Sequence, residues 1–539
     1  MASAATTETT APRGARQAQP EGGWGMLAVL IVGVALIVLD STIVAVSLPA
    51  IISDLGLTLT NAAWITSLYS VVFAALLLTM GTLGDRFGTK KMFLIGQVFF
   101  GVGSLVAAMA SSFAPLLLAR GIQGIGGAIV LPATLATINA TFRGPRRAAA
   151  FGIWGATMAS AAAIGPLAGG VLTEQLSWPW IFLVNPPICA VLFVLAMRLL
   201  PETIAKRSRK GFDVAGTLLS MVAFGTIVFG LIEGESYGWW SARGEYSLGG
   251  VSPAPLAIII GLVALGFFVA LESARARRGR AALFDPSLLR LPSFLAGNIT
   301  AMTVSIGEFA ALFVLPLYLV NVAGLGTIRS GVVLATMALG AILSGVAARH
   351  LATKLGPALT VVVGLILEVV GIVSAAIVVA PGASIACLSA VLAVYGAGMG
   401  LASAQLASVI LHDVPLEKSG MGSATQSTFR QLGSALGAAF AGTTLAAAVG
   451  SYLPQQLVDG LKLPPEAAQS LADATATTAG SAMNALSAKL PDPQAALGIL
   501  HDGFSHGTSA ALYVAAACLA LGLVSSLVLL AQARHSDAA

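Results

Sequence analysis

Long apolar stretches, separated by short polar segments, occupy most of this chain. A transmembrane helix needs about 20 mainly apolar residues to cross about 30 Å of hydrocarbon, and fourteen stretches reach that length. The stretches are continuous and do not alternate with a period of two, which favours helices over the strands of a membrane barrel. The pattern predicts an all-α membrane protein with fourteen transmembrane helices. The predicted spans lie near residues 25–49, 62–83, 91–111, 114–138, 148–172, 180–200, 213–233, 254–273, 294–320, 328–350, 357–379, 384–410, 425–449 and 508–530.

The composition agrees with this prediction. Hydrophobic residues make up 57% of the chain, charged residues only 9%, and the mean hydropathy is +0.90, whereas soluble domains carry about 25% charged residues. Sixty glycines suit the close packing of helices in lipid. The three cysteines lie in separate spans without metal-ligand spacing, so neither a disulfide nor a metal site is expected.

The basic residues predict the orientation of the chain in the membrane. If the N-terminus is cytoplasmic, 22 of the 28 Lys and Arg residues fall on cytoplasmic segments and only four on outer ones. This bias predicts a multi-pass protein of the cytoplasmic membrane with both termini inside. It also explains the net charge of +5 without a nucleic-acid partner.

A weak internal repeat divides the chain into six helices, two helices and six helices. Asp40 in the first span and Glu308 in the ninth are each followed about two helical turns later by Leu-Pro. Such repeats are typical of transporters and predict two six-helix bundles related by pseudo-twofold symmetry, plus two inserted helices. The expected domains are a disordered cytoplasmic tail (1–24), an N-terminal bundle (25–200), a linker with the inserted helices (201–292), a C-terminal bundle (293–533) with an extracellular loop (451–507), and a cytoplasmic tail (534–539). The extracellular loop is too polar to span, so it is expected to form short amphipathic helices or a flexible cap.

Five motifs follow one another along the chain and carry a family resemblance. In chain order they are LDSTIVAVSLP (39–49) in the first span; Gly81, Leu83, Asp85, Arg86, Gly88 and Lys90 after the second; Arg120, Gln123, Gly124 and Gly126 in the fourth; Gly165, Pro166, Gly169 and Gly170 in the fifth; and WPWIFLVNPP (178–187). Over residues 25–530 the chain resembles the major facilitator superfamily, and specifically its fourteen-helix drug:proton antiporter group. Thr89 replaces a usual basic residue and Ala161 a usual glycine, so two motifs are incomplete.

The resemblance implies roles for the loop and fifth-helix motifs. Asp85 and Arg86 are expected to pair with neighbouring helix ends as a conformational latch; alternatively, the basic residues of this loop only follow the positive-inside rule. The fifth-helix glycines and proline are expected to form a hinge or a seal against proton leak, or to allow close packing.

Five ionisable residues lie within predicted spans, where each charge costs at least about 2.5–3.5 kcal/mol and therefore needs a use. They are Asp40, Arg120, Glu308, Glu368 and Arg430. The resemblance implies that the first, fourth and ninth spans line a central cavity. Asp40, Glu308 and Arg120 are therefore the expected proton-coupling residues, with Glu308 as the principal proton carrier. The alternative is structural hydrogen bonding and charge balance. Glu368 is expected on a peripheral helix in a structural or lipid-side position, and a structural pair is equally open for Arg430.

The resemblance makes a proton-coupled antiporter the expected function, with export of small amphipathic or aromatic drugs or antibiotics by alternating access. A monomer in the lipid bilayer is expected, with the proton gradient as energy source and no cofactor. Gln123, Phe309, Phe313 and Tyr318 are expected to line the substrate cavity. An enzyme or an ATP-driven pump is not expected, because the chain lacks HExxH and GxxxxGK[ST]. The alternative is a facilitator or importer of a specific small metabolite on the same fold.

Overall fold

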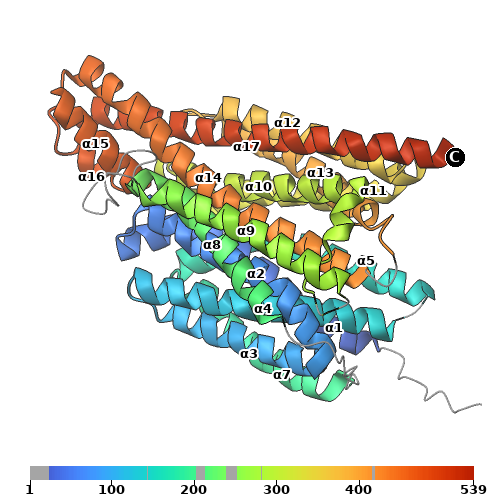
Figure 1. Ribbon diagram of the computed structural model, residues 1–539. Helices are drawn as coiled ribbons and strands as arrows, with labels where there is room; N and C mark the ends of the chain where they lie inside the picture. The colour runs from blue at the N-terminus through green and yellow to red at the C-terminus, as the bar shows by residue number, and fades with distance from the viewer. Residues whose placement is uncertain are drawn as a thin grey trace, which may run out of the picture.

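The computed structural model describes residues 23–142, 144–201, 213–237, 252–278, 280, 282–415 and 419–538. Within these ranges the regular structure is entirely helical, and the long helices run side by side (Figure 1). The predicted tail 1–24 lies almost wholly outside the described residues, as does part of the 201–292 linker.

Every predicted span corresponds to a helix. The N-terminal helices are α1 (Trp24–Leu55), α2 (Leu59–Phe87), α3 (Thr89–Ala108), α4 (Phe113–Thr141), α5 (Gly144–Gln175), α6 (Trp180–Leu183) and α7 (Asn185–Leu199). The inserted pair is α8 (Val214–Tyr237) and α9 (Pro253–Arg277), followed by a short 3-10 helix, η1 (Pro286–Arg290). The C-terminal helices are α10 (Pro292–Asn321), α11 (Thr327–Leu355), α12 (Pro357–Val378), α13 (Ile385–Ile410), α14 (Ser419–Leu461), α15 (Pro465–Thr477), α16 (Met483–Ser487) and α17 (Pro493–Ala538). Thirteen spans in the described ranges are long and apolar enough to cross a membrane, and α5 lies in the place of the remaining predicted span.

The first six and the last six spans pack in the same way, which confirms the predicted pseudo-symmetry. In the N-terminal half α4 packs against α2 and α3, α1 against α5, and α3 against α7. In the C-terminal half α13 packs against α11 and α12, α10 against α14, and α12 against α17. The turns between the second and third helices of each half also match, because Gly88 and Gly356 both adopt positive φ (+93° and +83°), a conformation that favours glycine.

The two halves meet through two equivalent helix pairs, α2 with α14 and α5 with α11, and through α1 with α10. The inserted helix α8 packs against both α2 and α14, and α9 lies against α8. Polar contacts fix α8 along α2. Trp64 Nε1 donates to Glu233 Oε1 at 2.8 Å, and the hydroxyls of Thr79 and Thr217 are 2.8 Å apart. The inserted pair therefore covers one side of the junction between the halves.

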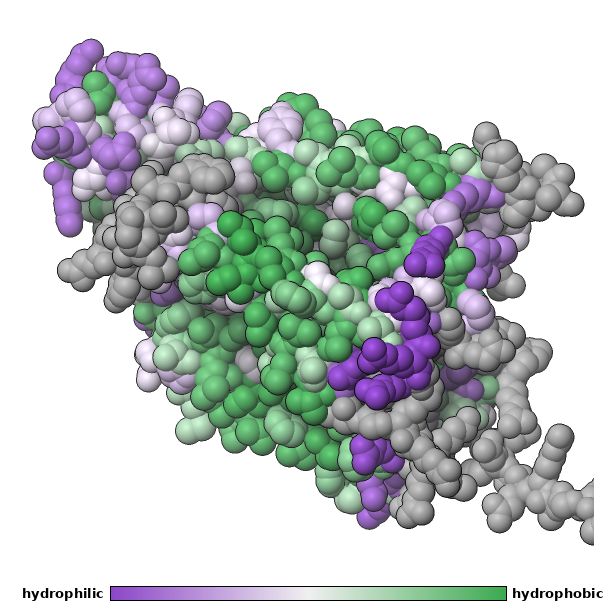
Figure 2. All heavy atoms as spheres, viewed as in Figure 1, coloured by the Kyte–Doolittle hydropathy of each residue, from purple (hydrophilic) through white to green (hydrophobic). Residues whose placement is uncertain are grey.

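The two ends of the bundle differ. We call the end that carries the start of α1 and the C-terminus the tail end, and the opposite end, which carries α15 and α16, the cap end (Figure 1). An apolar surface lies between them, with hydrophilic side chains at both ends, as Figure 2 shows. This distribution is the one expected for a protein that crosses a bilayer.

The predicted 451–507 loop is helical. Helix α14 continues to Leu461 and α17 already begins at Pro493, with α15 and α16 between them. Of the two forms expected for this segment, short amphipathic helices are present: α15 buries Ala468, Ala472 and Ala476, which recur every fourth residue on one face. The tail predicted for 534–539 is also helical as far as Ala538, because α17 continues to that residue.

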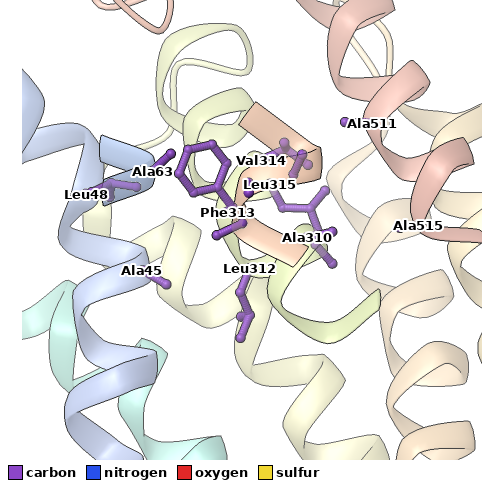
Figure 3. Packing of buried hydrophobic residues seen from close by; sticks show 14 of the residues in the cluster. Ala45, Leu48, Ala63, Ala310, Leu312, Phe313, Val314, Leu315, Ala511 and Ala515 are labelled. Carbon is purple, nitrogen blue, oxygen red and sulfur yellow. The ribbon is translucent and has the colours of Figure 1, made fainter. Parts of the chain in front are cut away.

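Close contacts between the halves gather in the cap-end half of the bundle. The Phe313 side chain of α10 packs near Ala63 of α2 and Gly442 of α14, and Ala45 and Leu48 of α1 belong to the same buried cluster (Figure 3). Because lipid is as apolar as these side chains, close packing rather than the hydrophobic effect holds such helices together. The halves are therefore closed against each other at the cap end.

Candidate functional site

Polar side chains of the N-terminal half converge in a fully buried cluster. Asp40 lies on α1, Ser104 on α3, Arg120 and Gln123 on α4, and Asn185 at the first residue of α7. Each is at most 1% exposed. Their burial follows from the sequence, because glycine and alanine around them allow the four helices to approach closely.

The Asp40 carboxylate is the centre of this cluster. Arg120 Nη1 donates to Oδ2 at 2.5 Å, and the side-chain amides of Gln123 and Asn185 each donate to Oδ1 at 3.0 Å. Both amides also lie within hydrogen-bond distance of Ser104 Oγ, at 2.8 and 3.1 Å. The carboxylate is therefore paired with a cation and accepts two further hydrogen bonds, as a buried charge requires.

The Arg120 guanidinium has further partners. Its Nε donates to the carbonyl oxygen of Ile65 at 3.1 Å, and its Nη1 donates to Gln123 Oε1 at 2.8 Å. The Tyr69 ring centroid lies 4.4 Å from the guanidinium carbon, within the range of a cation–π interaction. The cluster thus joins α2 to α1, α3, α4 and α7. In this conformation both charges are closed off from solvent.

The C-terminal half carries a more open charge pair. Arg430 Nη2 of α14 lies 4.0 Å from Glu308 Oε2 of α10. The Arg430 side chain is 43% exposed, whereas that of Glu308 is 10% exposed. A charged side chain exposed to this degree within a span is expected to face a water-filled space rather than lipid. Glu308 therefore lies at the boundary between the packed interior and that space.

Glu368 does not take the lipid-side position, one of the two that were expected for it. It lies on α12, as expected, but it is fully buried and does not face the lipid side. Helix α12 packs mainly against α13 and α17, and Gly398 of α13 leaves room for the Glu368 side chain. The charges of Glu308 and Arg430 both act on Glu368.

The four residues predicted to line a substrate cavity lie in different surroundings. Gln123 belongs to the buried cluster around Asp40, and Phe313 is 2% exposed in the contact between the halves. Tyr318 is also fully buried, and its hydroxyl donates to the carbonyl oxygen of Ala380 at 2.7 Å. These three side chains are packed in this conformation, contrary to the expectation that they line open space. Phe309, next to Glu308, is half-buried.

The loop motif lies at the tail end between α2 and α3. Gly88 forms the turn, and Lys90 Nζ donates to the carbonyl oxygen of Met197 at 2.8 Å, near the C-terminal end of α7. Arg86 is exposed, and its guanidinium lies 5.6 Å from the neighbouring Phe87 ring centroid. The Asp85 side chain falls outside the described part of the chain, and Gly81 lies nearest to α4. These contacts lie within the N-terminal half, and the latch between halves remains a prediction.

The fifth-helix motif lies where α5 meets two other helices. A side chain at Gly165 would overlap Thr42 of α1, and a Cβ at Gly169 would lie 2.8 Å from the Ile43 carbonyl oxygen. A Cβ at Gly170 would lie 2.7 Å from the carbonyl oxygen of Thr327 on α11, where the backbone of Pro166 also approaches α11. The motif thus permits close approach both within the N-terminal half and across the junction. A hinge or seal function remains a prediction.

Several residues of the site were not predicted from the sequence. Asn185 donates to Asp40, the Tyr69 ring lies against Arg120, and Ser104 accepts from the amides of Gln123 and Asn185. Tyr395 of α13 lies close to the backbone of α12. Asn185 alone carried a usable signal, because it is an amide inside an apolar span and directly precedes two prolines. A separate cavity of about 380 Å³ lies at the cap end between α2, α8, α14 and α15, lined in part by Glu233 and Asp473.

Comparison with known proteins gives one family. The model of the Major Facilitator Superfamily matches residues 30–438. The tetracenomycin C resistance and export protein of Streptomyces glaucescens is 32% identical, covering 84% of this chain and 81% of the relative. The multidrug efflux pump LfrA of Mycolicibacterium smegmatis is 32% identical, with 79% and 82% covered. The puromycin resistance protein pur8 of Streptomyces alboniger is also 32% identical, with 82% and 86% covered.

A solved structure supports the fold. A bacterial homologue of the human lysosomal transporter Spinster, in an inward-facing and unoccupied conformation, superposes with a TM-score of 0.61. The match covers 94% of this chain and 97% of that chain at 17% sequence identity. At this identity the likeness supports the arrangement of helices alone.

Proposed function

The chain belongs to the major facilitator superfamily, and we propose that it exports drug-like compounds or antibiotics across the cytoplasmic membrane in exchange for protons. The names of its relatives support the substrate class, because they include export and resistance proteins for several chemically different antibiotics. The observation that supports the proton coupling is the charge pair within two spans: the Glu308 carboxyl group, whose side chain is 10% exposed, lies 4.0 Å from Arg430, whose side chain is 43% exposed.

The tail end is the cytoplasmic end in this proposal. The basic residues of the described loops are concentrated there, and Figure 2 places hydrophilic side chains at that end of the apolar surface. Since the halves are in close contact at the cap end, the conformation described is then the inward-facing one. Alternating access requires the α5–α11 and α2–α14 contacts to separate at the cap end when the cavity opens outward.

Glu308 and Arg430 suggest how a proton and a substrate are exchanged. Once Glu308 has released its proton to the cytoplasm, its carboxylate forms an ion pair with Arg430. A substrate that enters the open space then competes with Arg430 for this carboxylate, or binds beside it against the Phe309 ring. After outward opening, proton uptake by Glu308 removes the charge and favours substrate release. A single charge moving through 100 mV supplies about 2.3 kcal/mol for this cycle.

The buried pair in the N-terminal half has a different role in this mechanism. Asp40 and Arg120 hold α1 and α4 together, and α1 also contacts α10 of the other half. The pair is closed to solvent here, so it exchanges no proton in the inward-facing conformation. We infer that it keeps the N-terminal half rigid while the halves move.

Drug uptake into inside-out vesicles tests the function. An imposed proton gradient should drive accumulation of a lipophilic fluorescent drug from a panel, and an uncoupler should abolish it. Glu308→Gln should abolish gradient-driven accumulation, whereas the matched control Glu466→Gln, an exposed carboxyl group on α15, should not. Accumulation that persists in Glu308→Gln would contradict the assigned proton carrier. Equilibration without accumulation in wild-type vesicles would favour the facilitator.

A further inference from the structure

Glu368 is a buried carboxyl group that the mechanism above does not use. It lies on α12, and none of its surface is exposed. The side chain lies against α13 because Gly398 has no side chain; a Cβ there would lie 2.8 Å from Glu368 Cγ. The fold therefore makes specific room for this carboxyl group.

Neither carboxylate oxygen of Glu368 has a hydrogen-bond partner among the described residues. The hydroxyl of Tyr395, one helical turn before Gly398 on α13, is likewise buried without a partner in the same set. Ionised carboxylates in a membrane interior are paired with a cation or hydrogen-bonded, as Asp40 is. Glu368 has neither form of support, so its environment suits a neutral carboxylic acid.

The charged groups that act on Glu368 are Glu308 from α10 and Arg430 from α14. The Tyr395 hydroxyl on α13 is the other titratable group coupled to both carboxyl groups. One guanidinium thus serves two carboxyl groups, and it lies near Glu308. When Glu308 is ionised and paired with Arg430, no cation remains for Glu368.

We propose that Glu368 is a second proton-binding site of the transport cycle, which holds a proton while Glu308 is paired with Arg430. This inference rests on the antiport function proposed above and adds a second carboxyl group to it. The two carboxyl groups and one arginine then allow the C-terminal half to carry one proton in the inward-facing conformation and two when Glu308 is also protonated. In both states the two carboxyl groups together carry at most one negative charge, which Arg430 neutralises.

Infrared spectroscopy of the purified protein in lipid tests the protonation state without transport. Wild type at neutral pH should show the carbonyl stretch of a buried carboxylic acid that exchanges slowly in heavy water. Glu368→Gln should lose this band, and the exposed-carboxyl control Glu466→Gln should keep it. Glu368→Met, which is apolar and of similar length, serves as a second variant if Glu368→Gln does not fold.

Proton counting tests the role in transport. In vesicles, the number of protons exchanged per drug molecule should stay unchanged in Glu368→Gln, because Glu368 holds its proton in both states described above and only Glu308 exchanges one. An unchanged infrared band would overturn the proposal, because Glu368 would not hold the proton. A lost band with a lower proton-to-drug ratio would overturn it as well, because Glu368 would then release its proton during the cycle instead of holding it. Absence of proton-driven uptake in wild type would instead overturn the antiport function itself, and the two failures are thereby distinguished.

Discussion

The buried pair of Asp40 and Arg120 allows a quantitative prediction. Replacing Arg120 by Met keeps most of the side-chain length but removes the cation, which leaves the Asp40 carboxylate with only the amides of Gln123 and Asn185. Both charges are at most 1% exposed, so neither can regain solvent without opening the helices. Breaking a buried pair from one side costs about 3–5 kcal/mol. We expect a loss of this size from Arg120→Met, and a similar one from Asp40→Asn.

The double variant should recover much of this loss. Without either charge the site contains only neutral polar groups, and replacing both members of a buried pair is far less costly than removing one. The coupling energy from the double-mutant cycle should therefore be at least about 2 kcal/mol. Interhelical hydrogen bonds in a membrane protein average only about 0.6 kcal/mol, so such a value would identify a charge pair.

Reversible unfolding in mixed micelles, titrated with a denaturing detergent and followed by circular dichroism, measures these free energies. The matched control cycle is Trp64→Phe with Glu233→Gln, a half-buried hydrogen bond between α2 and α8 at 2.8 Å, for which we expect a coupling energy below about 1 kcal/mol. Additive effects of Asp40→Asn and Arg120→Met, within about 0.5 kcal/mol, would refute the reasoning.

Three further predictions concern the junction, the packing and the tail end. Cysteines at Ala63 and Gly442, in a chain without its native cysteines, should form a disulfide, because the Cβ separation of 3.7 Å fits one. Oxidation should block transport and reduction should restore it. Undiminished transport in the oxidised protein would contradict closure at the cap end. Gly396→Ala should lower the thermal midpoint sharply, because the new Cβ would overlap a backbone carbonyl of α11, whereas Gly225→Ala, with open space beside it, should not. The hydrogen bond from Ser293 at 2.6 Å, with the neighbouring histidine, lowers the pKa of Asp413 below its usual value. The stabilisation from this hydrogen bond is present above the unfolded-state pKa of Asp413 and is lost as the pH falls through its lowered folded-state pKa. Ser293→Ala should therefore lower the thermal midpoint at neutral pH and leave it unchanged below that lowered pKa. A difference in thermal midpoint that does not depend on pH would contradict this.

The sequence predicted the helices well because lipid imposes a simple rule. Each span must be long and apolar, and each charge within it needs a use. Asp40, Arg120 and Glu308 could therefore be selected from the sequence as candidates. The further hydrogen-bond partners around Asp40 could not, because Asn185 donates both to Asp40 and to Ser104 from a helix that is distant in sequence, and only packing brings these residues together.

The differences between the expected and the observed surroundings have a common physical cause. Tyr318 and Phe313 were assigned to a cavity because they share a helix with Glu308, but the conformation closed at the cap end buries both. For Glu368 a lipid-side and a structural position were both left open because its helix is peripheral, and its burial excludes only the lipid-side one. A pattern of residues gives the helix and its face only approximately, and it does not specify which of several conformations a moving protein adopts.

The exchange of a proton for a substrate is the central claim, and substrate-induced proton movement tests it most directly. Inside-out vesicles are first acidified in the interior, and the interior pH is followed with a trapped pH-sensitive dye while drug is added outside. The account predicts that drug addition makes the interior less acidic in wild type and that Glu308→Gln abolishes this response. Drug that enters wild-type vesicles without any change in interior pH would contradict proton antiport.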